Sequence, residues 1–577
     1  MYLVLALTIL ATLAEGIGIV MLLPLLKAID GFDSGETTGV GAALQNILDR
    51  IGIADSLLGL LLLIAGFFLL KGAFMFLAQG YKAYLRGQLM RELKGRMYDD
   101  YSRMSYQYYA SRDTGYFTNL INAQVQHFLT AFTSIIQFSA KTLMAIVYIG
   151  VALVVAWRFG VMALVVGGLI MAAFGVLNVY VRDLSRRSAA EASVLSKLMI
   201  QSLQSFKYLV ATAQGDKPRK QTLKSIHRLT GYEIRSGIAK AFTSSVREPL
   251  IVVAILAVVI VQLLWFNQPL AAILVSIVLF KRGLDAILQM QTTLQATLSK
   301  IGSVEKVQEE FERQRQVREP EGGIEIGPLE EGVRFESVSF RYGADQDTVL
   351  KDISLEIAHL QSVALVGESG AGKSTLVDML TLMLKPVAGR ILIDDVPADQ
   401  IRLSSWRRQI GYVAQETVVF NDTIANNICM WAGDTSSDEV LMGRVREAAR
   451  QAHIAHFIES LPDGFDTEVG DRGMRLSGGQ RQRLFIAREL FKRPRLLILD
   501  EATSALDTES EQEIQKSIDE LRGKMTVVII AHRLSTVRNV DRIYVLDQGR
   551  IVEQGDYELL RNDESTRFAQ LVAMQEL

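Results

Sequence analysis

The amino-acid sequence predicts a multidomain membrane protein in which a helical transmembrane domain precedes an α/β domain. Hydrophobic residues make up 49% of the 577 residues, a high share for a soluble chain. They are concentrated in the first half, whereas charged residues dominate after roughly Ser299. In the second half, a glycine-rich segment from Gly367 to Thr375 separates a short apolar run from a helix-like run. This order of strand, loop and helix is typical of an α/β domain that binds a phosphate group.

Six apolar segments in the first half predict six membrane-spanning helices. Each approaches the ~20 residues that an α-helix needs to cross a bilayer core. The predicted spans lie at about residues 2–29, 57–80, 133–157, 159–181, 249–266 and 269–291. The first is too long for a signal-peptide core and has no basic segment before it. A chain that begins directly in a span is consistent with a cytoplasmic segment that this sequence lacks. The predicted transmembrane domain covers residues 1–305.

The connections between the spans differ strongly in positive charge. Two long connections, from Lys82 to about Ala131 and from Arg182 to Arg247, are rich in lysine and arginine, and the other loops carry few basic residues. Positive segments stay on the cytoplasmic side, so both long connections and both termini are predicted to be cytoplasmic. Each connection is helical in pattern and can turn near its middle, at Ser111–Gly115 and near Gln214–Lys217. These turns fit either contacts with a cytoplasmic domain or solvated charged loops.

Several charged residues lie within the predicted spans, where hydrocarbon makes them costly and marks them as functional candidates. Lys71, Arg247, Lys281 and Arg282 are the candidates for binding a phosphate-bearing head group, provided that they face one cavity. Lys141 is also basic, and Glu15 and Asp285 are acidic. The alternative is a structural role, by snorkelling to the interface or by an internal ion pair such as Lys281 with Asp285.

The segment between the apolar half and the α/β domain is polar, with Pro320 and several glycines. It predicts a linker over residues 306–332, and residues 333–577 form the second domain. Within that domain the segment Gly367–Thr375 fits the pattern G-x-x-x-x-G-K-[ST]. Its backbone N–H groups can surround phosphates, the lysine can reach the β- and γ-phosphates, and the serine can ligate Mg²⁺. The residues predicted to bind nucleotide here are Gly367, Glu368, Ser369, Gly370, Ala371, Gly372, Lys373, Ser374 and Thr375.

Five further features suited to nucleotide chemistry occur in the same domain. Tyr342 precedes the glycine loop and can stack on an adenine ring, and Gln415 follows a short apolar strand. The segment Leu476–Gln480 begins a helix, whose N-terminus suits a phosphate. An apolar strand ends in Asp500 and Glu501, of which the first can hold Mg²⁺ and the second can polarise the attacking water. His532 follows another apolar strand, where it can reach the γ-phosphate.

This ordered set of motifs resembles the ABC transporters, and six spans followed by one nucleotide domain resemble an exporter-type half-transporter. The resemblance covers essentially the whole chain. It implies that Leu476–Gln480 is the signature motif, Gln415 the Q-loop, His532 the switch histidine and Ser504–Asp507 the D-loop. Thr467–Gly473 resembles the exporter-specific loop that meets the coupling turns. Within it, Asp471 stands where the family more often has glutamate.

The resemblance also implies how the site is completed. Each ATP would lie between the phosphate loop of one chain and Ser477, Gly478, Gly479 and Gln480 of another, which implies a homodimer. The cofactors implied are ATP and Mg²⁺, with Ser374, Gln415 and Asp500 at the metal. Glu501, His532 and Gln415 are the implied catalytic residues, and both sites of the dimer are expected to be complete.

The expected function is ATP-driven export or flipping of an amphipathic, phosphate-bearing lipid or lipid-linked oligosaccharide across a bacterial-type inner membrane. The first span, from Glu15 to Leu26, looks like the first helix of bacterial flippases for lipid-linked oligosaccharides. Such a protein would work by alternating access of a homodimer within membrane lipids. The alternative cargo is a hydrophobic drug or a peptide.

Other classes of function fit the sequence less well. A soluble ABC ATPase of DNA repair or translation would lack the six apolar runs. The formal net charge of −2 also gives no indication of nucleic-acid binding. A channel or receptor that only senses ATP would differ from a pump in lacking cargo-stimulated turnover. Cys429 is the only cysteine, so neither an intrachain disulfide nor a cysteine metal cluster can form.

Overall fold

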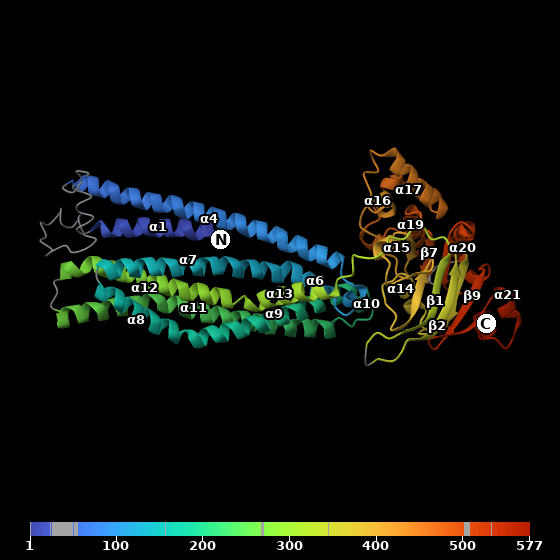
Figure 1. Ribbon diagram of the computed structural model, residues 1–577, viewed down its shortest axis with the longest axis horizontal. Helices are drawn as coiled ribbons and strands as arrows, with labels where there is room; N and C mark the ends of the chain where they lie inside the picture. Colours follow the sequence, from blue (N-terminus) through green and yellow to red (C-terminus); the bar gives the residue numbers. More distant parts are fainter. Residues whose placement is uncertain are drawn as a thin grey trace. The chain divides into compact units, whose positions relative to one another are not determined.

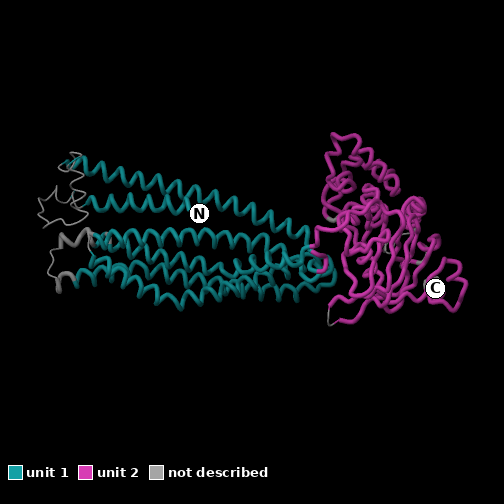
Figure 2. Tube along the Cα trace, in the orientation of Figure 1, with its two compact units in different colours: residues 1–104, 108–318 teal, residues 105–107, 319–577 magenta. Residues whose placement is uncertain are grey.

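The computed structural model describes residues 2–22, 25, 50, 56–155, 157–266, 270–343, 346–500, 508–531 and 533–576. The chain divides into two compact units (Figure 2). Unit 1 contains Met1–Met104 and Tyr108–Arg318, and unit 2 contains Ser105–Gln107 and Glu319–Leu577. Unit 1 is helical, whereas unit 2 combines helices with two β-sheets (Figure 1).

Unit 1 is built mainly from long helices. They are α1 (Tyr2–Val20), α4 (Leu57–Ser102), α5 (Tyr106–Ala110), α6 (Thr114–Asn119), the π-helical turn η1 (Leu120–Gln124), α7 (Val125–Val155), α8 (Trp157–Ala173), α9 (Gly175–Gln204), α10 (Phe206–Ala211), α11 (Asp216–Phe266), α12 (Leu270–Leu298) and α13 (Ile301–Val317). At 46 residues, α4 is about 69 Å long, more than twice the ~30 Å of a bilayer core. Such a helix must extend well beyond the hydrocarbon, because its apolar residues occupy only its first half.

The described part of the chain contains four helices long and apolar enough to cross a membrane, or five when one bent pair counts as a span. The four are Tyr2–Val20, Leu57–Ser102, Thr114–Val154 and Asp216–Val261, and the bent pair is Trp157–Ala173 with Gly175–Gln204. The sixth predicted span overlaps α12, and residues 267–269 before it lie outside the described residues. The end of the first predicted span and most of the predicted interfacial helix at 42–51 also lie outside them. The number of six spans therefore stays a prediction.

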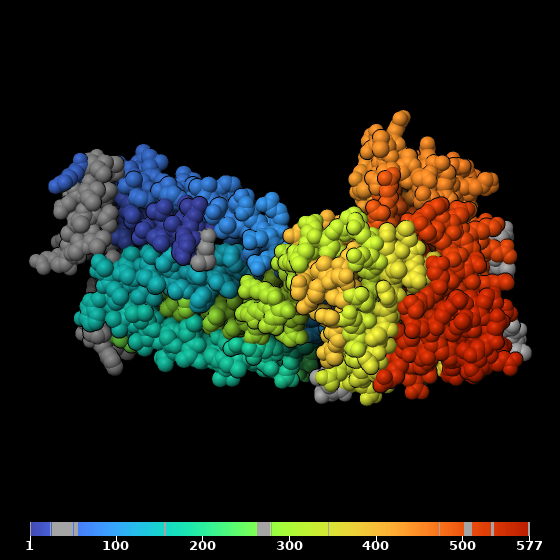
Figure 3. Space-filling model, turned by 45° about the vertical axis from the view of Figure 1, so that its right-hand side comes forward, coloured from blue at the N-terminus to red at the C-terminus, as the bar shows by residue number. Residues whose placement is uncertain are grey.

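The helices of unit 1 pack closely along their lengths. Helix α1 lies between α4 and α7, and α12 packs against α7 and α8 (Figures 1 and 3). A Cβ added at Gly167 of α8 would lie 2.3 Å from Cδ1 of Ile287 in α12, so the glycine permits this approach. Likewise, a Cβ at Gly302 of α13 would lie 2.7 Å from the backbone of Arg186 in α9. Small residues set the spacing of these helices.

The chain turns at both positions that the sequence predicts, between α5 and α6 and between α10 and α11. The first turn is anchored within unit 1. Tyr108 and Tyr116, on either side of it, donate hydrogen bonds of 3.0 and 2.8 Å to the buried carboxylate of Glu310 in α13. Asp113 in the turn also pairs with Lys197 of α9 at 2.8 Å. Two other helices therefore fix the conformation of this turn.

Unit 2 contains two sheets. The four-stranded antiparallel sheet has the order β2-β1-β4-β5, and the six-stranded sheet has the order β10-β9-β3-β8-β7-β6. The strands of the first are β1 (Gly332–Phe340), β2 (Leu350–Ala358), β4 (Ala388–Ile393) and β5 (Val396–Pro397). Those of the second are β3 (Ser362–Gly367), β6 (Ile410–Val413), β7 (Leu496–Asp500), β8 (Thr526–Ile530), β9 (Arg542–Asp547) and β10 (Arg550–Gly555). All neighbours in the second sheet are parallel except β10 with β9.

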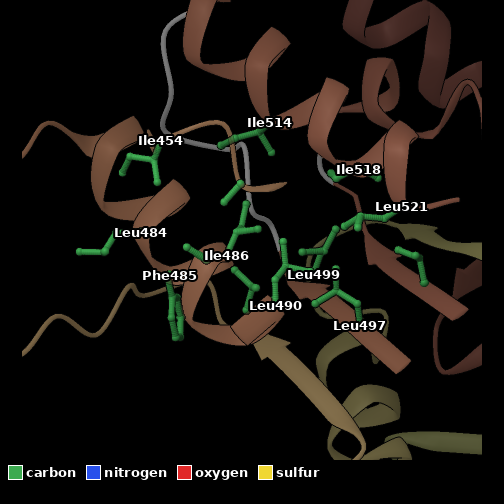
Figure 4. Close-up of a cluster of buried hydrophobic side chains, with 14 of the residues drawn as sticks. Ile454, Leu484, Phe485, Ile486, Leu490, Leu497, Leu499, Ile514, Ile518 and Leu521 are labelled. Carbon is green, nitrogen blue, oxygen red and sulfur yellow. The ribbon is translucent and has the colours of Figure 1, made fainter. Parts of the chain in front are cut away.

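Helices cover the six-stranded sheet on both faces. The helices of unit 2 are α14 (Lys373–Leu380), α15 (Leu403–Arg407), α16 (Ile424–Cys429), α17 (Glu439–Gln451), α18 (Ala455–Glu459), α19 (Gly478–Phe491), α20 (Thr508–Leu521), α21 (Tyr557–Asn562) and α22 (Arg567–Glu576). Figure 4 shows residues of α19 and α20 packed over Leu497 and Leu499 of β7. Leu496 and Ile498 point to the opposite face and join the core that includes α14. This alternation explains why β7 is apolar throughout, as parallel strands buried on both faces must be.

Candidate functional site

The glycine loop connects β3 to α14, as the motif requires. The backbone of Gly370 and Gly372 has φ values of +85° and +103°, which favour glycine. A Cβ at Gly367 would lie 2.2 Å from the carbonyl oxygen of Leu546 in the neighbouring strand. The Lys373 ammonium group donates to the carbonyl oxygens of Gly367 and Glu368 at 2.8 and 2.9 Å. The loop is therefore a compact turn at the N-terminus of α14, where a phosphate is favoured.

Four neighbouring parallel strands end on the same edge of the sheet. The glycine loop follows β3, and Asp500 is the last residue of β7. Gln415 lies two residues after the end of β6, and β8 ends at Ile530, which pairs with Asp500. Carboxyl ends of parallel strands are the usual ligand-binding edge of such sheets. The fold thus brings the glycine loop, Gln415 and Asp500 to one edge, although they span more than 130 positions of the sequence.

Asp500 lies in a buried and acidic environment. It is 7% exposed, and the hydroxyl of Tyr412 donates to its Oδ2 at 3.4 Å. Burial and then the charge of Asp500 raise the pKa of Asp378, on α14, to about 6. The same two causes raise the pKa of Tyr412 above its ordinary value. A buried carboxylate near the hydroxyl of Ser374 supplies the hard oxygen ligands that Mg²⁺ prefers, with phosphates and water completing the shell.

Tyr342 is positioned beside the glycine loop. Its hydroxyl lies 3.0 Å from Oγ1 of Thr375, and its ring makes an edge contact with Phe340 at 4.9 Å between centroids. The side chain is nevertheless 45% exposed, which leaves ring surface for another group. This arrangement fits a stacking platform that is tethered to the phosphate loop.

The signature segment begins α19 with a capping box. The Ser477 hydroxyl accepts from the N–H of Gln480 at 3.2 Å, and the Gln480 side chain accepts from the N–H of Ser477 at 2.8 Å. The hydroxyl is thereby fixed at the start of the helix, next to Gly478 and Gly479, which add no side chain. The preceding segment Thr467–Gly473 includes a short 3₁₀ turn over its last three residues.

A buried arginine in α19 was not predicted from the sequence. Arg488 is 3% exposed and donates to the carbonyl oxygens of Asn427 and Val418 at 2.7 and 2.6 Å. A third bond of 2.9 Å reaches the side-chain oxygen of Asn427. Its guanidinium also lies 5.2 Å from the ring centroids of Phe420 and Phe485. It thus joins the helix that carries the signature motif to the segment that follows Gln415.

Three predicted features lie outside the described residues. They are Glu501, the segment Ser504–Asp507 and His532. Glu501 directly follows β7, and His532 follows β8 by one intervening residue. Their roles stay predictions.

In unit 1, two of the four predicted head-group residues meet on one carboxylate. Lys71 of α4 lies 2.8 Å from Oε2 of Glu15 in α1, and Arg282 of α12 lies 3.2 Å from its Oε1. The Tyr148 hydroxyl of α7 also donates to Glu15. Glu15 is 1% exposed, whereas Lys71 and Arg282 are 27% and 44% exposed. Four helices that are distant in the sequence therefore share this cluster.

The remaining predicted residues form a second pair. Arg247 of α11 lies 3.0 Å from Asp285 of α12, and Gln289 donates to the same carboxylate at 2.8 Å. The ion pair that the sequence offered as an alternative, Lys281 with Asp285, is replaced by this one. Lys281 is exposed, and it points away from Arg282 because successive helical residues differ by about 100°.

Comparisons with known proteins cover both halves of the chain. The family described as ABC transporter matches residues 350–504, and the ABC transporter transmembrane region matches residues 1–288. The heterocyst differentiation ATP-binding protein HepA of Nostoc sp. is 30% identical, covering 96% of this chain and 90% of that protein. An ATP-dependent lipid A-core flippase of Chromohalobacter salexigens is 32% identical, covering 93% of each chain.

A further lipid A-core flippase, from Bordetella pertussis, is 34% identical over 86% of this chain and 80% of its own length. Among solved structures, a bacterial Atm1-family ABC exporter with ATP bound has a TM-score of 0.80 and 26% identity. That likeness covers 100% of this chain and 98% of the other.

Proposed function

Because this chain belongs to the ABC transporter family, which couples ATP hydrolysis to transport, we propose that it flips or exports a phosphate-bearing amphipathic lipid across a bacterial-type inner membrane. The observation that carries this proposal is the meeting of Lys71 and Arg282 near the middle of their predicted spans. Cations in hydrocarbon are costly, so two that converge there indicate an anionic ligand. Relatives named lipid A-core flippases support a lipid cargo, and lipid-linked oligosaccharides share its chemistry.

The nucleotide chemistry is assigned to the edge of the six-stranded sheet. Residues Gly367–Thr375 would hold the phosphates of ATP, and Tyr342 would stack on the adenine. Ser374, Gln415 and Asp500 would hold Mg²⁺, which supplies charge neutralisation for phosphoryl transfer when it is bound. Glu501 would polarise the attacking water, and His532 would contact the γ-phosphate. The shared strand edge supports this assignment for the residues that the structure describes.

The proposed working unit is a homodimer with its ATP-binding domains and termini in the cytoplasm. Ser477–Gln480 of one chain would complete the phosphate site of the other, and the fixed Ser477 hydroxyl supports that role. Alternating access would follow, since ATP holds the dimer closed and hydrolysis releases it. To move a two-state equilibrium from 1:99 to 99:1, ATP must favour the closed state by ~5.5 kcal/mol. The turns at Ser111–Gly115 and near Gln214–Lys217 are the proposed transmission points.

The first prediction concerns the two converging cations. In the double variant Lys71→Gln/Arg282→Gln, stimulation of ATPase activity by lipid A in nanodiscs is expected to need at least about tenfold more lipid. The physical reason is the loss of two charge-assisted hydrogen bonds to phosphate. Transport is followed in parallel in proteoliposomes with a panel of lipid A, lipid-linked sugars, drugs and peptides.

The matched control is Arg86→Gln, which neutralises an exposed arginine of α4 beyond its predicted span. It is expected to leave the lipid dependence unchanged. If the double variant still transported phosphate lipids normally, the head-group site would be wrong. If only drugs or peptides stimulated the wild-type protein, the alternative cargo would replace the lipid.

A further inference from the structure

The charged cluster of unit 1 contains more cations than anions. Lys141 of α7 lies close enough to Glu15, Asp285, Arg247 and Lys71 to interact electrostatically with all four. The described members are therefore four cations, Lys71, Lys141, Arg247 and Arg282, and two anions, Glu15 and Asp285. With each side chain in its usual ionised form, the net charge is +2 (four minus two). Such an excess between apolar helices favours a ligand that carries about two negative charges.

Glu15 occupies the centre of this cluster. Both of its oxygens are engaged, Oε2 with Lys71 and Tyr148 and Oε1 with Arg282. The carboxylate is almost completely enclosed, yet the two cations remain partly exposed on their outer sides. A carboxylate held by an ammonium, a guanidinium and a hydroxyl uses the same donors that recognise a phosphate.

We propose that Glu15 sets the selectivity of the cargo site for phosphate, by competing with the ligand for Lys71 and Arg282. The inference rests on the proposed function, because it concerns the head-group site of that function. A phosphate monoester with two charges balances the net charge of +2 and offers three oxygens, so it competes well with Glu15. A phosphodiester or carboxylate with a single charge gains less from the cluster and competes poorly. Glu15 therefore acts as a threshold that weaker anions do not pass.

The test compares wild-type protein with Glu15→Gln in nanodiscs that contain increasing amounts of phosphatidic acid or phosphatidylglycerol, and ATPase stimulation is measured. The first lipid is a phosphate monoester, and the second is a phosphodiester. In the wild type, phosphatidic acid is expected to act at a lower concentration. In Glu15→Gln, the half-maximal concentration is expected to fall about tenfold for phosphatidylglycerol and less for phosphatidic acid, because the competitor is gone.

Two further variants separate charge from structure. Glu15→Asp keeps the carboxylate and is expected to retain the wild-type preference. Tyr148→Phe removes one hydrogen bond to Glu15 without changing a charge, and it should shift the preference in the same direction by a smaller factor. Asp183→Asn is the control for net charge, since it removes an exposed carboxylate of α9 that pairs with Arg187 at 2.9 Å. It is expected to change nothing.

The outcomes distinguish this inference from the function on which it rests. If neither lipid stimulates the wild type, and lipid A also does not, the proposed function fails. If the wild type prefers phosphatidic acid and both Glu15→Gln and Tyr148→Phe keep that preference, the selectivity role of Glu15 is overturned. A parallel loss of response to both lipids, with lower thermal stability, would likewise overturn it in favour of a purely structural ion pair.

Discussion

Replacing Glu501 with glutamine is expected to lower ATP turnover by about 100-fold or more while ATP binding is retained. Glutamine is nearly isosteric with glutamate but cannot accept a proton from the attacking water. The phosphate loop, the Mg²⁺ ligands and the signature segment are untouched by this change. ATP should therefore bind and close the dimer without being consumed. The measurements are steady-state ATPase activity in nanodiscs and retention of labelled ATP after rapid gel filtration.

The control for Glu501→Gln is Glu520→Gln on α20. Glu520 is 61% exposed and pairs with His453 at 3.3 Å, away from the strand edge that carries Asp500. Its neutralisation should leave turnover within about twofold, as is usual for exposed pairs. Near-normal turnover in Glu501→Gln would remove Glu501 as the general base. Loss of ATP retention would instead mean that the residue is needed to bind the nucleotide.

Replacing Arg488 with methionine is expected to destabilise the ATP-binding domain by about 2–4 kcal/mol. Methionine fills a similar length but cannot donate to the carbonyl oxygens of Val418 and Asn427, which would remain buried without those donors. The contacts of the guanidinium with Phe420 and Phe485 would also be lost. A change of this size corresponds to a fall of about 5–15 °C in the unfolding temperature of a domain of this length.

The effect of Arg488→Met is measured on the full chain by thermal unfolding in detergent, with and without ATP. Arg446→Met on α17 is the control, because Arg446 is exposed and its loss should leave the unfolding temperature within about 2 °C. ATPase activity should fall together with stability, since Arg488 connects α19 to the segment after Gln415. A variant as stable as the wild type would show that the three hydrogen bonds contribute little.

The nucleotide half of the fold could be predicted because its motifs are local. The sequence around Gly367–Thr375 specifies its own turn, and the flanking apolar runs specify the strand and the helix. The hydrogen bond from Tyr412 to Asp500 and the bonds of Arg488 could not be predicted in this way. Each depends on which strands and helices become neighbours, and several topologies satisfy the same apolar pattern. Glu501 and His532 were predicted from the strands before them, and their roles await the tests above.

The membrane half shows the opposite balance between cost and pairing. The sequence indicated that Lys71, Arg247 and Arg282 are costly in their spans, because cost depends on the residue and its apolar neighbours alone. Pairing depends on how the helices face each other, which the sequence does not specify. Asp285 therefore pairs with Arg247 rather than with Lys281, four residues before it on the same helix. Tyr148 was missed because a single tyrosine in an apolar run carries no signal of its partner.

The buried Glu310 of α13 has a mechanical consequence for unit 1. Its carboxylate accepts hydrogen bonds from both tyrosines that flank the turn between α5 and α6, and Gln314 adds a third at 2.8 Å. Three bonds to one buried charge resist shear far better than exposed contacts do. The turn and α13 thus form one stiff lever, so that a displacement applied at either end moves the other with little elastic loss.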